Sequence, residues 1–105
     1  PGFMEEKLSF ADIEMDLAAH RVYRNGEIVP LGPTEYRLLK FLLERPKRVY
    51  AREQLLDQVW GHDIYVEERT VDVHIGRLRK ALNKNNNKDL VRTVRGGGYS
   101  LDQTE

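Results

Sequence analysis

Basic side chains recur at helical spacing between residues 69 and 80, around one valine and one glycine. With about 100° per residue, one face of a helix would carry Arg69, Val73, Gly76, Arg77 and Lys80. The arginine fork matches O6 and N7 of guanine, and an apolar side chain covers a thymine methyl. The pattern predicts a surface that reads base edges in the major groove of DNA. The alternative is a solvated helix face, in which Gly76 is an ordinary helix glycine that costs about 1 kcal/mol.

A second basic position, Arg95, stands directly before three glycines at positions 96–98. An arginine at a glycine-rich tip is suited to a narrow minor groove, whose negative potential attracts it. The alternative is a plain surface arginine in a tight turn. The glycines lack the GxGxxG spacing and no helix follows them, so they do not predict a phosphate-binding loop.

Residues for catalysis or for metal binding do not cluster in the sequence. The three histidines, His20, His62 and His74, have no metal-ligand spacing, and the chain has no cysteine. No nucleophile or phosphate-loop motif occurs. We therefore expect no enzyme, no metal and no cofactor. His74 falls beside the apolar side of the basic helix, which leaves it open whether it packs in the interior or donates to a DNA phosphate.

Charge is unevenly distributed along a chain whose net charge is zero. Residues 69–95 hold eight Lys and Arg against two Asp, whereas the rest holds nine basic and fifteen acidic residues. This asymmetry favours a polyanion-facing surface on an otherwise acidic body, although a solvated helix face would also account for it. The 105 residues suit one domain. Without an apolar run of membrane-spanning length or a signal peptide, a cytoplasmic protein is expected. Residues 1–4 fit no element and are interpreted as a vector-derived remnant.

Short strands are predicted in the first third of the chain, at residues 8–10, 13–17, 20–23 and 27–31. Asn25 and Gly26 together favour a type I′ turn. A helix should begin at Gly32-Pro33 and end before Pro46. A second helix is expected from about residue 51 to residue 60, with Gly61 as a left-handed cap.

The third helix, predicted over residues 68–83, has one tight apolar stripe of Val71, Ile75, Leu78 and Leu82 opposite its basic face. Two strands, at residues 90–94 and 99–101, then form a hairpin around the glycines. Two helices, a loop, a basic helix and a hairpin are the order of a winged helix-turn-helix. The fold class is therefore α+β, with residues 68–83 as the recognition helix and the hairpin as the wing.

Three stretches of the chain resemble the DNA-binding output domain of the OmpR/PhoB family of bacterial response regulators. They are GPTEYRLLKFLLERPKRVYAREQLLDQVWG, YVEERTVDVHIGRLRKAL and VRTVRGGGY. The resemblance covers residues 8–101 and is closer to the PhoB branch, which implies an activator of a phosphate-starvation response. It implies a four-stranded N-terminal sheet, three helices and a C-terminal hairpin. It further implies a receiver domain before residue 1, a sensor histidine kinase, and tandem head-to-tail dimers on direct repeats in double-stranded DNA.

Individual DNA contacts are also implied by the resemblance. Val73 and Arg77 match base-contacting positions, Arg52 and Trp60 match backbone-contacting positions, and Arg95 matches the wing arginine of the minor groove. The predicted DNA-binding set is Arg52, Trp60, Arg69, Val73, His74, Gly76, Arg77, Arg79, Lys80, Thr93 and Arg95.

An acidic loop precedes the basic helix and contains Asp63, Glu67 and Glu68. The resemblance implies that this loop contacts the sigma subunit of RNA polymerase. The alternative is local, because Glu67 and Glu68 also complement the dipole of the helix that follows them.

Two positions depart from the family pattern. Gly76 stands where the PhoB branch has an arginine, which puts one polar DNA contact in doubt. Ala51 stands at a helix N-cap that is usually serine, which should weaken the cap. The rival function is that of a winged-helix module that binds a protein partner instead of DNA; the basic face of the third helix argues against it.

Overall fold

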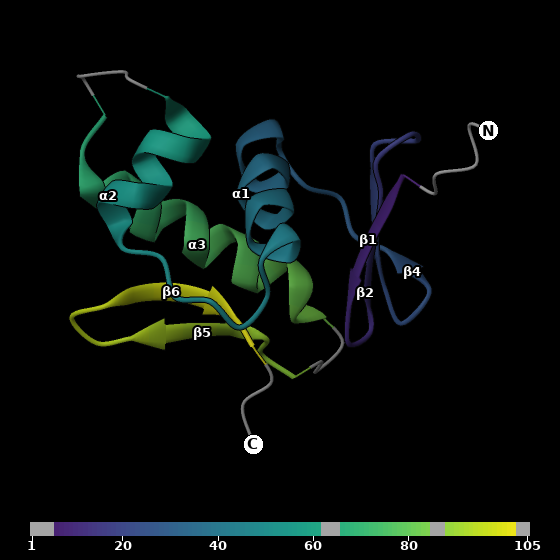
Figure 1. Cartoon of the computed structure of the whole chain (residues 1–105). Coiled ribbons are helices and arrows are strands. Elements are labelled where there is room, and N and C mark those ends of the chain that lie inside the picture. Colours follow the sequence, from purple (N-terminus) through teal and green to yellow (C-terminus); the bar gives the residue numbers. More distant parts are fainter. Residues whose placement is uncertain (1–5, 62–65, 85–87, 103–105) are drawn as a thin grey trace.

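The chain begins with a four-stranded antiparallel sheet (Figure 1), seen in a computed structural model that describes residues 6–61, 66–84 and 88–102. Strands β1 (Lys7–Phe10), β2 (Ile13–Asp16), β3 (Arg21–Arg24) and β4 (Glu27–Ile28) pair in chain order. Asn25 and Gly26 have φ of 52° and 80°, as a type I′ turn requires. Strand β4 is shorter than predicted and ends before Pro30, whose ring nitrogen has no hydrogen to donate.

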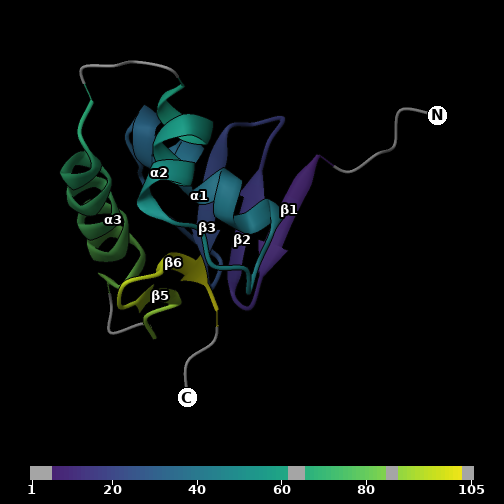
Figure 2. The ribbon, with the colours of Figure 1, turned by 60° about the vertical axis from the view of Figure 1, so that its left-hand side comes forward.

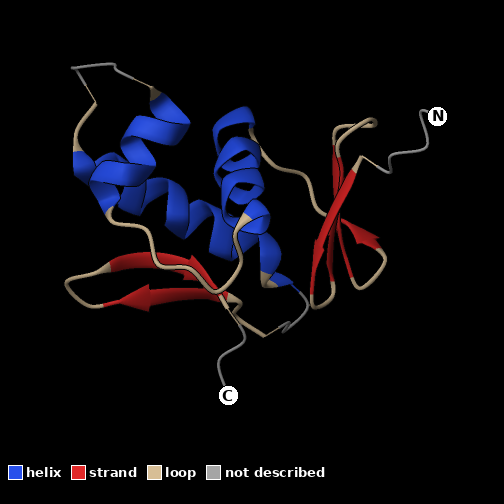
Figure 3. Ribbon diagram, in the orientation of Figure 1, coloured by secondary structure: helices blue, strands red, loops and turns tan. Residues whose placement is uncertain are grey.

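Three helical segments follow the sheet; in Figure 3 they lie beside the N-terminal sheet and above the C-terminal hairpin. They are α1 (Pro33–Glu44), α2 (Arg52–Leu55), which continues without a break into the π-helical turn η1 (Leu56–Trp60), and α3 (Glu68–Leu82). Helix α1 begins after Gly32 and ends before Pro46, as predicted, and α3 occupies the predicted range to within one residue.

The second helix differs from the prediction in two respects. Its second half is a π-helical turn rather than α-helix, which the 3.6-residue apolar spacing could not indicate. Gly61 has a φ of 79° with a ψ of −151°, a conformation open to glycine but different from the left-handed cap that we expected. At the other end, Ala51 offers no side-chain oxygen; its own N–H instead donates to Oε1 of Gln54 at 2.8 Å.

The C-terminal hairpin consists of β5 (Val91–Val94) and β6 (Gly98–Leu101). The segment between α1 and α2 pairs with this hairpin through a single antiparallel β-bridge, from Tyr50 to Tyr99. The N–H of Tyr50 donates to Tyr99 O at 2.8 Å, and the N–H of Tyr99 donates to Tyr50 O at 2.9 Å. Gly98 has a φ of +125°, and a Cβ added there would lie 1.9 Å from Tyr50 O. A side chain is therefore excluded at the start of β6.

One continuous apolar core joins the sheet, the helices and the hairpin. The predicted stripe of α3 is buried, with each of its four side chains at most 1% exposed. Packing of α3 against α1 and α2 fixes the orientation of the opposite, basic face. The other large core side chains with no exposure are Ile13, Met15, Leu38, Leu39, Leu42, Leu55 and Leu101.

A buried arginine fastens the N-terminal sheet to the end of α3. Arg24, which is 2% exposed, donates from Nε to Asp12 at 3.0 Å. Its Nη1 donates to Leu82 O and to Asn83 Oδ1, each at 3.0 Å, and its Nη2 donates to Lys88 O. All of these acceptors lie at the end of α3 or just after it, except Asp12 on the β1–β2 turn.

Candidate nucleic-acid interface

The outward face of α3 carries the side chains that the sequence placed there. Arg69, Val73, Gly76, Arg77 and Lys80 are all exposed, directly opposite the buried stripe. Val73 is 51% exposed and is one of two large apolar side chains left in solvent in the described part of the chain. An exposed valine among three cations has no role inside the folded protein, but it fits contact with a thymine methyl.

Gly76 has no packing reason to be glycine. A Cβ added at this position would meet no atom within 4 Å, and the residue lies in the middle of α3. A glycine there costs about 1 kcal/mol relative to alanine. Both interpretations of Gly76 agree with this geometry: room for a molecule that approaches from outside, or an ordinary helix glycine.

The wing lies below α3 in Figure 1 and beside the lower end of α3 in Figure 2. Arg79 of α3 joins the two elements, since its Nη2 donates to Val91 O at 2.8 Å and also to Thr93 Oγ1. Its Nε lies 3.3 Å from Asp89 Oδ2. The structure thus brings Arg79 and Thr93 together, as a contact between the helix and the wing. Arg95 is exposed at the tip of the hairpin.

Asp72 organises the junction of α2, α3 and the wing, and sequence reasoning did not single it out. It accepts from Arg52 Nε at 2.9 Å and from the Tyr99 hydroxyl. The Asp72 carboxylate raises the pKa of Arg52. Burial, together with the hydrogen bond to Asp72, raises the pKa of Tyr99. The sequence signal for Asp72 is that it is an acid within a basic segment, where a nearby cation can pair with it.

His74 is turned toward the interior rather than toward solvent. Its side chain is 17% exposed, and Nδ1 is hydrogen-bonded to Oε2 of Glu35. The indole of Trp60 lies beside it, with ring centroids 5.4 Å apart. Glu35, which is 8% exposed, lies in the first turn of α1 and is a buried partner of α3. The geometry therefore matches packing in the interior for His74 rather than a hydrogen bond to a DNA phosphate. Trp60 is half-buried beside it.

The acidic residues before α3 are exposed where the structure describes them. Glu67 occupies the N-cap without a side-chain cap hydrogen bond, and Glu68 lies in the first turn. Asp63 and His62 lie outside the described residues.

His20, the remaining histidine, stacks on Tyr36 with ring centroids 3.7 Å apart. Over residues 6–61, 66–84 and 88–102, no group of three or more His, Asp or Glu side chains is placed to hold a metal ion. Within those same ranges no helix has the length and apolar character needed to cross a bilayer.

The chain also matches a known protein family over most of its length. Residues 26–101 match the family described as "Transcriptional regulatory protein, C terminal". The chain is 62% identical over 102 residues to the phosphate regulon transcriptional regulatory protein PhoB of Rhizobium meliloti (strain 1021). That match covers 97% of this chain and 45% of the relative, so the chain spans about half the length of the curated relatives it matches.

Two solved structures in complex with DNA are similar over nearly their whole length. One is the DNA-binding domain of the response regulator AdeR with an intercistronic region, at a TM-score of 0.82 and 33% identity, covering 91% of this chain and 99% of that one. The other is the Klebsiella pneumoniae RstA DNA-binding domain with the RstA box, at a TM-score of 0.80 and 30% identity, covering 92% and 97%. The α+β winged helix-turn-helix predicted from the sequence is confirmed.

Proposed function

The chain belongs to the OmpR/PhoB family of response-regulator DNA-binding domains, and from this premise we propose that it binds double-stranded DNA sequence-specifically as the output domain of a transcriptional regulator. The observation that carries the proposal is the two-sided α3. One side is fully buried, which makes the helix rigid, and the other presents two arginines and a lysine around an exposed valine. A helix of this kind enters the major groove with its outward side chains on the base edges.

Selection of bound sequences from random DNA tests the proposal. We expect the winners to share a motif that occurs as direct repeats about one helical turn apart, because we propose tandem head-to-tail binding. We also expect affinity to fall steeply as the salt concentration rises, since lysines and arginines displace counterions from DNA. Enrichment of no motif, together with salt-independent binding, would favour the protein-interaction alternative instead.

We assign different tasks to the recognition helix and the wing, with Arg77 on a guanine in the major groove and Arg95 in the minor groove. Arg77→Ala should cost about 1–3 kcal/mol of binding free energy and relax the preference at one base position. Arg95→Ala should weaken binding most where the flanks are A·T-rich, because the narrow groove there attracts arginine. Titrations of the selected site, its single-base variants and its flank variants measure both effects.

Each variant serves as the control for the other. Arg77→Ala should leave the ratio between A·T-rich and G·C-rich flanks unchanged, and Arg95→Ala should leave the base preference unchanged. An equal loss for Arg77→Ala on every single-base variant would mean that Arg77 meets only phosphate. If Arg95→Ala left the ratio between A·T-rich and G·C-rich flanks unchanged, the assignment of Arg95 to the minor groove would be wrong.

For the whole regulator we propose a receiver domain ahead of this chain, a sensor histidine kinase, a cytoplasmic location and a phosphate-starvation response. The support is the 62% identity to a phosphate regulon protein, of which this chain matches 45%. A reporter driven by the selected repeats should respond to phosphate limitation in cells that contain the full-length protein. Reporter expression that does not change with phosphate supply would contradict this assignment of the signal.

We propose that the acidic loop before α3 contacts the polymerase sigma subunit. Charged residues at the rim of an interface mainly steer and specify a partner. Asp63→Ala with Glu67→Ala should lower transcription in vitro from a target promoter while DNA affinity stays the same or rises slightly. Glu67 makes no side-chain cap hydrogen bond, and Glu68 is unaltered in the first turn of α3. The melting temperature of the double variant should therefore be unchanged. Full transcription by the double variant would exclude the contact, and a lower melting temperature would favour the helix-dipole explanation.

A further inference from the structure

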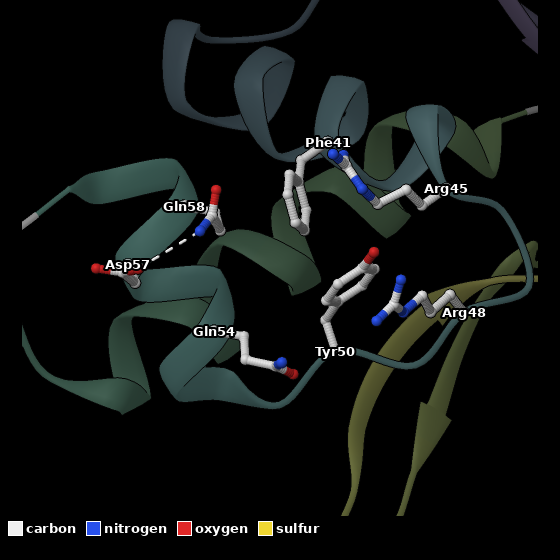
Figure 4. A pocket seen from close by; sticks show the side chains of 7 residues that line it. All are labelled: Phe41, Arg45, Arg48, Tyr50, Gln54, Asp57 and Gln58. Atoms are coloured by element: carbon white, nitrogen blue, oxygen red, sulfur yellow. Dashed lines mark hydrogen bonds between the residues drawn. The ribbon is translucent and has the colours of Figure 1, made fainter.

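A cavity of about 370 Å³ opens between the end of α1, the segment that joins α1 to α2, and the first turns of α2 and η1. Helix α3 passes behind it (Figure 4), so the cavity faces away from the outward side of α3. It shares no residue with the predicted DNA-binding set, and its volume is in the range of small-molecule sites. The lining residues are Phe41, Arg45, Arg48, Tyr50, Gln54, Asp57 and Gln58.

Two arginines lie over aromatic rings at one end of the cavity. The guanidinium of Arg45 is 5.0 Å from the centre of the Phe41 ring, and that of Arg48 is 5.4 Å from the centre of the Tyr50 ring. Contacts of this kind orient a guanidinium without using its hydrogen-bond donors. Arg45 also lies 3.4 Å from Glu44 in an exposed pair, which holds it weakly. No carboxylate in the described ranges forms an ion pair with Arg48.

The Tyr50 hydroxyl is a buried polar group without a partner. Tyr50 is 5% exposed, and its hydroxyl has no hydrogen bond among the described residues. Arg48 lies beside its ring, and its hydroxyl points toward the space between Arg48 and Arg45 (Figure 4). The two backbone hydrogen bonds with Tyr99 fix the residue in place. A buried donor held in this way is costly until it meets an acceptor.

We propose that this cavity binds a small oxyanion, that is, a phosphate- or carboxylate-bearing small molecule, through Arg45, Arg48 and the Tyr50 hydroxyl. Guanidinium forks match the geometry of both oxyanions and form short, charge-assisted hydrogen bonds with them. An oxyanion would supply the acceptor that the Tyr50 hydroxyl lacks. The ligand and DNA would bind at the same time, because the two surfaces lie on opposite sides of α3.

The remaining polar groups agree with an anion at the arginine end. Asp57, the one acid in the lining, lies across the cavity from both arginines, where Gln58 Nε2 donates to it at 3.4 Å (Figure 4). Gln54 accepts from Ala51 N–H through Oε1, which leaves its amide NH₂ to donate. The lining therefore has two guanidinium cations and three neutral donors, against one carboxylate. The neutral donors are the Tyr50 hydroxyl and the amides of Gln54 and Gln58.

The test is an NMR titration of the chain with inorganic phosphate and, separately, with citrate, while chloride holds the ionic strength constant. We expect saturable shifts of the side-chain Nε–H signals of Arg45 and Arg48. Arg48→Gln and Tyr50→Phe should each weaken binding about tenfold, as for a lost hydrogen bond to a charged group. Tyr50→Phe should also keep or raise the melting temperature, since it deletes an unpaired buried hydroxyl. Arg77→Gln, on the outward face of α3, is the matched control and should leave the titration unchanged.

Saturation with one probe or with both supports the proposal, and the pattern tells phosphate from carboxylate. Shifts that never saturate, or that Arg77→Gln removes equally, would overturn it. A lower melting temperature for Tyr50→Phe would show that the hydroxyl already has a partner, which also overturns it. DNA affinity should be the same for Arg48→Gln as for the unaltered chain; a weaker affinity with a smaller salt slope would place Arg48 on the DNA backbone and contradict the site.

Discussion

Gly98→Ala should reduce the free energy of unfolding by about 3–5 kcal/mol, the sum of backbone strain and lost hydrogen bonds. Gly98 has a φ of +125°, a region that side chains avoid, and its added Cβ would lie 1.9 Å from Tyr50 O and 2.8 Å from Ala51 Cα. Neither atom can turn aside, because both belong to the main chain. The pairing of Tyr50 with Tyr99 must therefore break. Urea denaturation followed by circular dichroism measures the loss.

Gly96→Ala is the matched control in the same hairpin. Gly96 also has a positive φ, of +77°, but a Cβ added there would meet nothing within 4 Å. It should cost only about 1–2 kcal/mol, the penalty of a left-handed conformation for a residue with a side chain. Similar losses for the two variants would mean that contact with Tyr50 does not decide the effect at Gly98.

Arg24→Met should cost about 3–5 kcal/mol of stability, as is usual when one partner is removed from a buried ionic network. Methionine retains the apolar stem but removes every donor of the guanidinium. Asp12, Leu82 O and Asn83 Oδ1 would each lose the hydrogen bond from Arg24; the bond to Leu82 O is buried and the other two are partly buried. Thermal and urea denaturation measure the loss.

Arg21→Met, on the same strand, is the control, since Arg21 is exposed and surface substitutions usually change stability by less than about 0.5 kcal/mol. Hydrogen exchange adds a second readout. Amides of β1, β2 and β3 should exchange faster in Arg24→Met, because the sheet loses its tie to α3. Equal stability of the two variants would contradict a structural role for Arg24.

Local patterns predicted the parts of the fold that depend on neighbours in sequence. The stripe of Val71, Ile75, Leu78 and Leu82 defined α3, its buried face and hence its outward face. Asn25-Gly26 fixed a hairpin turn, since the two residues tolerate the required backbone angles.

Contacts between distant residues could not be predicted in this way. Arg24 lies one residue beyond the strand predicted over residues 20–23. In the structure it belongs to β3 and alternates with buried Val22, but arginine is so seldom buried that its residue type argued against a place in the core. His74 and Glu35 are 39 positions apart, and nothing local pairs them. The same holds for Asp72, whose partners Arg52 and Tyr99 lie on two other elements.

The open space at Gly76 makes this chain well suited to site-specific labelling. The protein contains no cysteine, so Gly76→Cys would introduce a single thiol in the middle of the surface assigned to DNA. Because nothing lies within 4 Å of the new Cβ, a fluorophore attached there would leave the core undisturbed. Its emission would report the local polarity directly, and the labelled chain should bind DNA more weakly, because the label would fill the space at the centre of this surface.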